Sequence, residues 1–281
     1  MFFKRTKIED SFMGETHSAS SIAIYLLLFA LIPEVFFKMN GTESLYVVIT
    51  SIFVLYGASR LPDLDNSKSS AMSSLGLLGN AISDILRALS VFIYSITKTS
   101  KDNEEASAHR GFFHTILSGV LLFFLVKYTT SINKNVSIGN YIYTIGQLFA
   151  IFWVFICTQI SLSSIFKKKY DKNKDNGFTF INFIISLIIS TVLVSMVSTQ
   201  TKEYGWIAFT LSFGYVSHIL GDSLTPAGVP LFFPLKRKGK RWYVYRIAKI
   251  KAGGEIEKKI VLPLFIGTAI LSVIRIILYV I

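Results

Sequence analysis

The sequence predicts an all-α, polytopic membrane protein that folds as a single membrane-embedded domain over residues 1–281. The chain is 52% hydrophobic and 16% charged, whereas soluble domains carry about 25% charged residues. Mean hydropathy is +0.53. The apolar residues come in blocks, several of them near the ~20 residues that a helix needs to cross a bilayer. The alternative, a large soluble helical protein with a buried core, fits this patterning poorly.

Apolar blocks along the chain predict about seven membrane-spanning helices. The clear blocks are about 20–38, 44–59, 112–128, 139–165, 178–198 and 260–280. A further span over about 205–223 is more polar but keeps apolar residues such as Trp206, Phe213 and Ile219. Residues 75–97 carry Asp84 and Arg87 among leucines and isoleucines, which leaves open an interfacial or re-entrant helix in place of a span.

Basic residues predict the orientation of these spans. With the N-terminus in the cytoplasm, nearly every lysine and arginine falls in a cytoplasmic loop, and residues 225–259 form a basic cytoplasmic loop. The exceptions on the outer side are Lys38, Lys127, Lys134 and Lys202. The same count places the C-terminus outside. The net charge is +12. We expect the basic residues to bind anionic lipid headgroups, and we expect no binding of nucleic acid.

All four histidines lie in short motifs beside apolar blocks. The motifs are Thr16-His17, the segment from His109 to His114, and the segment from His218 to Asp222, and Asp63 and Asp65 add two carboxylates. Imidazole and carboxylate are ligands of zinc and similar divalent ions. The predicted topology brings all these motifs to the cytoplasmic face, so we expect them to meet.

The motifs also have purely structural interpretations. His218 and Asp222 are four residues apart and share one face of a helix, where they can bind metal or tie two helices together. Asp63 and Asp65 follow Pro62 in a predicted loop. Their carboxylates can converge on a cation, or the loop can simply be exposed to solvent. His109 and His114 are five apart and cannot share a helix face. His17 alone could be an ordinary interfacial histidine.

Two other features bear on the chemistry. Arg110, between two candidate ligands, could bind an anionic substrate oxygen such as that of a phosphate, or a lipid headgroup. The run from Lys236 to Tyr243 combines charge with aromatic rings and favours contact with anionic lipid. Cys157, the single cysteine, lies inside an apolar block and says nothing about the redox compartment.

In order along the chain, Thr16-His17, Leu61-Pro62-Asp63-Leu64-Asp65, the segment from His109 to Thr115 and the block from Gly214 to Leu231 resemble the YdjM family of bacterial inner-membrane proteins. The resemblance implies a metal-dependent hydrolase, distantly similar to zinc-dependent phospholipase C and P1-type nucleases, whose helical folds bind a zinc cluster through His and Asp. Two departures stand out: Asn66 replaces a histidine that the family often carries, and the basic stretch after Lys236 has no counterpart.

These observations favour a membrane-bound metal-dependent hydrolase over a non-catalytic metal-binding membrane protein with a structural, sensing or regulatory role. The predicted metal ligands are His17, Asp63, Asp65, His109, His114, His218 and Asp222. They exceed the four of a closed structural zinc site, which favours two or more zinc ions, with manganese as an alternative. Arg110 and Asp222 are the predicted catalytic residues, and the expected reaction is phosphoester hydrolysis in a phospholipid or lipid-linked substrate at the cytoplasmic face. The oligomeric state stays open.

Overall fold

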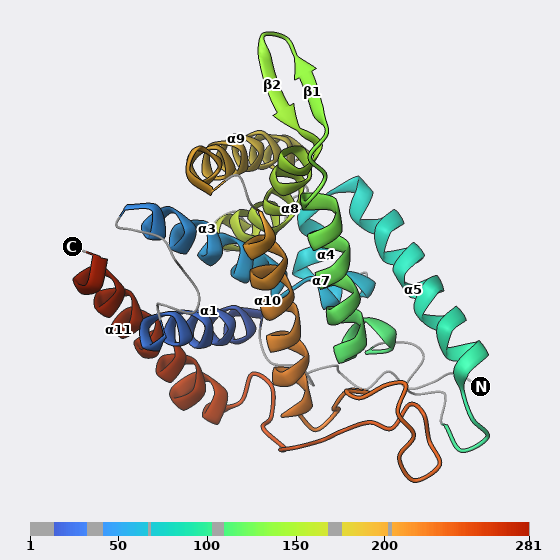
Figure 1. Ribbon diagram of the computed structural model, residues 1–281. Helices are drawn as coiled ribbons and strands as arrows, with labels where there is room; N and C mark the ends of the chain where they lie inside the picture. The colour runs from blue at the N-terminus through green and yellow to red at the C-terminus, as the bar shows by residue number, and fades with distance from the viewer. Residues whose placement is uncertain are drawn as a thin grey trace.

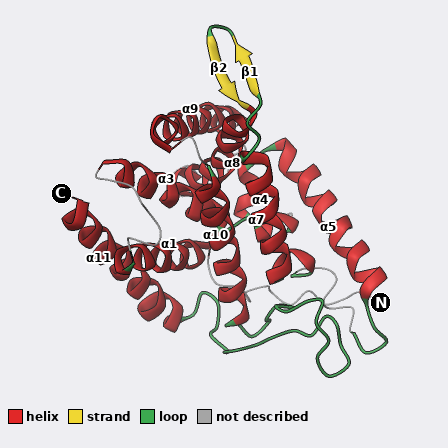
Figure 2. Ribbon diagram, in the orientation of Figure 1, coloured by secondary structure: helices red, strands yellow, loops and turns green. Residues whose placement is uncertain are grey.

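The described part of the chain is mostly helical, with one short β-hairpin and a long loop before the last helix (Figure 2). The computed structural model describes residues 14–32, 42–66, 69–102, 110–167, 176–201 and 204–280. The long helices are α1 (Gly14–Leu31), α3 (Thr42–Ala58), α5 (Leu77–Thr97), α7 (Ile116–Thr130), α8 (Ile145–Lys167), α9 (Asn176–Thr201), α10 (Gly205–Ser223) and α11 (Leu262–Val280). The short elements are η1 (Pro62–Asp65), α4 (Ser70–Ser74), η2 (Phe112–His114), β1 (Asn135–Ile138), β2 (Tyr141–Thr144) and the π-helical turn η3 (Glu257–Val261). The predicted all-α class is confirmed.

Each predicted span contains a helix, but some boundaries were wrong. The predicted span 205–223 coincides with α10, whereas α1 starts six residues before the predicted start at residue 20 and ends at Leu31. Residues 33–38 of that predicted span lie outside the described residues. Residues 139–144 are not helical: they complete a hairpin whose turn contains Gly139 with φ of 60°. Counting apolar residues missed the hairpin because such a count ignores their spacing. It therefore does not separate the two-residue period of a strand from the 3.6-residue period of a helix.

Four helical segments of the described chain are long and apolar enough to cross a membrane. They are Leu45–Asp65, Ile145–Phe166, Phe180–Val197 and Glu257–Leu278. Helix α7 is apolar but shorter, and α1 and α10 carry many serines, threonines and histidines among their apolar residues. The prediction of about seven spans is therefore not confirmed, while the membrane character of the fold is.

Close backbone contact between helices fixes the centre of the fold. A Cβ atom added at Gly57 of α3 would lie 2.2 Å from the carbonyl oxygen of Cys157 in α8. One added at Gly214 of α10 would lie 2.9 Å from the Cβ of Ala58 in α3. Small residues at such crossings let helix backbones approach closely, as is common in membrane proteins. The C-terminal end of α3 is thereby held between α8 and α10.

Helix α1 lies beside both α10 and α11 (Figure 1). Tyr25, Leu26 and Phe29 of α1 are buried together with Leu55 of α3 and Ile276 of α11. The hydroxyl groups of Tyr25 and Thr210 lie 2.9 Å apart, an additional polar tie between α1 and α10. This packing brings the first turn of α1 to the last turns of α10.

The two ends of the described chain's bundle differ in character (Figure 1). The β1–β2 hairpin projects from one end, and the long loop between α10 and α11 covers the opposite end. Part of this loop is anchored to the helices, because Val229 and Tyr245 exchange backbone hydrogen bonds and the N–H of Ile116 donates to the carbonyl of Leu231. The starts of α7 and η2 and the end of α10 therefore meet beneath the loop.

Candidate metal centre

His218 and Asp222 form the base of a polar cluster inside the bundle. They stand one turn apart on α10, both fully buried, with 3.6 Å between His218 Nε2 and Asp222 Oδ2. His218 Nδ1 lies 2.7 Å from the carbonyl oxygen of Ser59. Because a carbonyl oxygen only accepts, Nδ1 carries the proton and donates it there. The lone pair of Nε2 is therefore directed into the cluster.

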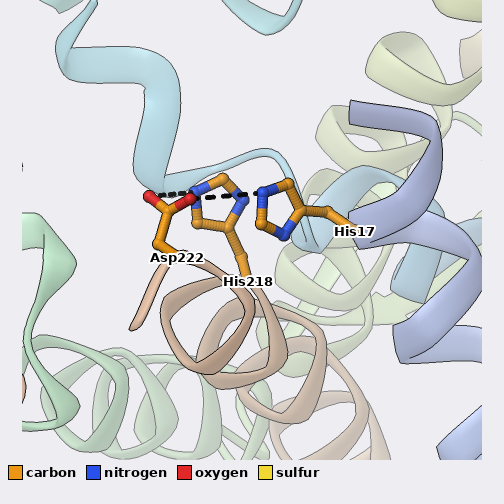
Figure 3. A group of neighbouring side chains, drawn as sticks. All are labelled: His17, His218 and Asp222. Carbon is orange, nitrogen blue, oxygen red and sulfur yellow. Dashed lines mark ion pairs between the residues drawn. The ribbon is translucent and has the colours of Figure 1, made fainter. Parts of the chain in front are cut away.

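His17 joins this pair from the first turn of α1 (Figure 3). Its ring stacks on that of His218, with 3.9 Å between the centroids. His17 Nε2 lies 3.4 Å from Asp222 Oδ1. The last polar turn of α10 and the first turn of α1 thus present two imidazoles and one carboxylate to the same point.

Asp63 and His114 complete the cluster from the two 3₁₀ turns. Pro62 begins η1 directly after α3 and places Asp63 Oδ1 3.6 Å from His218 Nε2. The turn η2 precedes α7 and places His114 Nε2 3.6 Å from Asp63 Oδ1 and 3.7 Å from Asp222 Oδ2. Asp63 keeps 24% of its side chain exposed whereas His114 is fully buried, so the cluster opens on the side of Asp63.

The spacing of these donor atoms suits a bound cation better than direct hydrogen bonding. Separations of 3.4 to 3.7 Å exceed the normal length of an N–H···O hydrogen bond. Ligands placed tetrahedrally about 2.1 Å from a zinc ion lie roughly 3.4 Å from one another. Nε2 of His218 is buried without a hydrogen-bond partner in the described chain, which is unfavourable unless a cation fills the cluster. Two overlapping groups could hold an ion: His17, His218 and Asp222, and Asp63, His114 and His218.

Asp65 stands one step behind the cluster. Its Oδ2 lies 3.7 Å from Nδ1 of His114, on the opposite side of the imidazole from Nε2. Metal-binding histidines commonly direct their second nitrogen to a carboxylate, which fixes the ring orientation. Asp65 thus lies beside His114 at a distance longer than a hydrogen bond, and the other predicted ligands that the structure describes make up the two groups of donor atoms.

Arg110 is engaged by the protein and does not face an open site. Its Nε lies 3.1 Å from Asp222 Oδ2, and its Nη2 donates to Asp222 Oδ1 at 3.2 Å. Its Nη1 donates to Thr225 Oγ1 at 3.2 Å and to the carbonyl of Gly228 at 3.3 Å. The turn after α10 folds back onto the guanidinium, and the expectation that Arg110 binds a substrate oxygen stays a prediction.

The backbone of Arg110 is also unusual. Its φ of 64° lies in the left-handed region, which is costly for a residue with a Cβ atom and is often retained at functional sites. Here this conformation turns the guanidinium toward Asp222. The preceding residue, the predicted ligand His109, lies outside the described residues.

Comparison with known proteins identifies the family. The model of the YdjM inner membrane protein family matches residues 12–168 and 177–281, which include every residue of the cluster. The chain belongs to the YdjM family. The match also covers the basic stretch after Lys236, so the expectation that this stretch has no counterpart in the family was wrong. No curated protein matches, and no solved structure matches. The expected distant similarity of this YdjM protein to zinc-dependent phospholipase C and P1-type nucleases therefore stays a prediction.

The sequence missed several groups that support the cluster in this YdjM protein. Ser59 contributes its carbonyl to His218, and its hydroxyl lies 3.0 Å from that of Ser18, the neighbour of His17. Thr225 binds Arg110. Ser18 and Thr225 adjoin the motifs in sequence, which was a usable signal. A backbone carbonyl leaves no trace in the residue type, so the role of Ser59 could not be read from the sequence.

The cluster can hold a divalent cation. Three imidazoles and two carboxylates suit zinc, manganese and similar first-row ions, and this donor set does not distinguish among them. Both groups of three use Nε2 of His218. That nitrogen has one lone pair, so it binds one ion at a time. The two groups therefore cannot both use His218 at the same time, and the expectation of two or more ions stays a prediction.

Proposed function

We propose that this YdjM protein is a membrane-bound metal-dependent hydrolase that cleaves a phosphoester in a phospholipid or a lipid-linked substrate. The observation that carries the proposal is the convergence of five donor side chains on one point, with the partly exposed Asp63 on the open side. A structural zinc site is closed by four ligands, whereas a catalytic site keeps a position for water or substrate. Zinc is the first candidate ion and manganese the second.

The residues around the centre have distinct tasks in this proposal. His17, His218 and Asp222 would hold the ion and leave one position open, and Ser59 and Arg110 orient two of them. His114 and Asp63 lie beside this position. When bound, the ion acidifies a water molecule and polarises a phosphoryl oxygen. Asp63, the exposed carboxylate, is positioned to accept a proton from the incoming water. Arg110 positions Asp222, and the direct substrate contact expected from the sequence stays a prediction.

The lipid nature of the substrate follows from the location of the centre. The cluster lies where α1 and α7 begin and where α3 and α10 end, in a member of an inner-membrane family. Basic residues of the loop after α10 lie at the same end of the molecule (Figure 1). This end faces the cytoplasm in the proposed topology, so an anionic headgroup meets the cluster and the basic loop together.

A non-catalytic metal site is the second candidate, and burial favours it. His17, His114, His218 and Asp222 are each at most 1% exposed. A centre this deeply enclosed also fits an ion that ties four helices together or that senses metal supply. The two candidates differ in whether the substrate reaches Asp63.

The test uses the full-length protein purified in detergent with zinc or manganese. Release of phosphate or of a phosphorylated headgroup from bacterial lipid extracts is measured for the wild type, Asp63→Asn and a matched surface control, Asp84→Asn. We expect metal-dependent release by wild type and Asp84→Asn, and loss of release with retained metal in Asp63→Asn. Metal bound at full occupancy without any release from any lipid class would establish the non-catalytic function instead.

A further inference from the structure

Helix α5 lies at the outer edge of the described bundle (Figure 1), and its protein-facing side combines polar residues with the partly buried Leu86 and Ile93. Ser83, Ser90 and Tyr94 of α5 are buried. Ser90 Oγ accepts the backbone N–H of Phe112 at 3.0 Å, and the ring of Tyr94 packs on Trp242. The helix is thus fixed to η2 and to the loop after α10 along one side.

The second side of α5 is a row of large apolar side chains open to the surroundings. These are Ile82 (36% exposed), Ile85 (66%), Leu89 (43%), Phe92 (58%) and Ile96 (65%). Their alternating spacing of three and four residues keeps them on one side, because each residue advances about 100° around the helix. A row of large apolar side chains open to the surroundings is the reverse of a helix surface on a water-soluble protein.

The third side of α5 is polar. Asp84, Arg87, Ser95 and Lys98 are all exposed, with the exposed Val91 among them. The helical spacing places these residues between the buried side and the apolar row. If α5 crossed the bilayer at the edge of the molecule, this side would place Asp84 and Arg87 in hydrocarbon, at about 2.5–3.5 kcal/mol each near the centre. The polar side therefore requires water.

The C-terminal end of α5 joins the basic loop. The carbonyl of Thr97 accepts Nη1 of Arg241 at 3.0 Å, and the hydroxyl of Thr99 donates to the carbonyl of Gly239 at 3.0 Å. Asp102 accepts the backbone N–H of Trp242 at 2.9 Å. This junction collects basic side chains at the end of the apolar row: Lys98, Lys101, Lys236, Arg237 and Lys238. Such a cluster complements anionic headgroups.

We propose that α5 meets the membrane at the edge of the bundle through its apolar row alone, without being enclosed by lipid. Its row from Ile82 to Ile96 rests on lipid acyl chains, its polar side faces water, and its basic end meets the anionic headgroups. Helices with separate apolar and charged sides contact bilayers through the apolar side. The hydrogen bond between Ser90 and Phe112 then holds η2, and with it His114, at the depth of the headgroups. This inference does not rest on hydrolysis and stands or falls separately from it.

Spin labels on two neighbouring positions test the proposal. Phe92→Cys lies in the apolar row and Ser95→Cys on the polar side one turn away, each made in Cys157→Ser and reconstituted in nanodiscs of phosphatidylethanolamine and phosphatidylglycerol. We expect the ratio of collision rates with oxygen and with a neutral nickel chelate to be several-fold higher at position 92 than at 95. Ile85→Cys and Ala88→Cys provide a second pair if one variant fails to fold.

Each other outcome overturns the proposal. Oxygen-dominated collisions at both positions would mean that α5 spans the bilayer. Nickel-dominated collisions at both would mean that the apolar row faces water. Protection of position 92 from both reagents would mean that another protein surface, such as a second copy of the chain, covers the row.

Discussion

At the residue scale, one nitrogen is common to the whole metal centre. His218 Nε2 belongs to both groups of donor atoms, and the Ser59 carbonyl fixes its orientation. Asp65 lies one step further out, beside Nδ1 of His114. The two residues should therefore differ in what their loss does to metal binding.

We predict that His218→Ala abolishes metal binding, whereas Asp65→Asn weakens metal affinity by about 10–100-fold, the usual effect of losing an outer-sphere partner. Elemental analysis of the purified proteins and competition with a fluorescent chelator measure both effects. The wild type should contain at least one ion per chain. A His218→Ala protein that keeps its full metal content would show that the ion binds elsewhere.

A second prediction at the residue scale concerns Asp102, which lies on the cytoplasmic side in the proposed topology. Partial burial raises the pKa of its carboxyl, but hydrogen bonds from Thr99, Trp242 and Arg241 outweigh burial and hold the pKa below its ordinary value. A depressed carboxyl pKa adds stability above the unfolded value of about 3.9, and this stability is lost as the pH falls through the folded value.

We therefore expect the backbone amides of Arg241 and Trp242 to be protected from hydrogen exchange at neutral pH and to lose protection only below about pH 4. Asp102→Asn should lose part of that protection at neutral pH, since the amide side chain accepts fewer hydrogen bonds. Mass-spectrometric exchange over peptides from 236–246 measures this, after correction for the intrinsic effect of pH. Equal exchange in both proteins at neutral pH would show that Asp102 does not hold the loop.

At the scale of elements, the crossing of α3 with α8 sets the position of η1 and so of Asp63. Gly57 permits that crossing, because a Cβ atom there would meet the backbone of Cys157 at 2.2 to 2.6 Å. Gly267 of α11, by contrast, has nothing within 4 Å of such an atom. The two glycines thus form a matched pair for substitution.

We predict that Gly57→Ala destabilises the protein by about 1–3 kcal/mol or more, the range of overpacking in a tight core, whereas Gly267→Ala is neutral or slightly stabilising. The midpoint of thermal unfolding in detergent, followed by size-exclusion chromatography, gives the comparison. Because α3 carries η1, Gly57→Ala should also lower metal affinity. Unchanged stability in Gly57→Ala would show that α3 and α8 lie further apart.

Contacts between residues close in sequence are easier to predict from the sequence than contacts between distant residues. The pair His218 and Asp222 was predictable because four residues form one helical turn. The different positions of Asp63 and Asp65 depend on the 3₁₀ turn after Pro62, which residue types alone do not specify. The bond between Arg110 and Asp222 joins residues 112 apart in sequence, and only the folded chain shows it. The hairpin was missed because the apolar block that follows outweighed the turn signal Gly139-Asn140 between two short alternating stretches.

At the scale of the whole molecule, the hairpin and the basic loop mark opposite ends (Figure 1). The distribution of lysine and arginine predicts that the loop end is cytoplasmic. We expect Asn140→Cys at the hairpin turn to react with a membrane-impermeant maleimide in intact cells, and Lys236→Cys to react only after lysis. Both variants are made in Cys157→Ser, whose unsubstituted form is the control. Labelling of position 236 in intact cells would reverse the orientation.

The ion pair between Arg110 and Asp222 has a consequence for how the protein matures. Thr225 and Gly228 hold the arginine in place, and neither contact requires a metal ion. A permanent cation therefore already balances the buried carboxylate before any metal arrives. We therefore expect the metal-free protein to be folded, so that metal stripped by a chelator is restored by simple addition, without refolding.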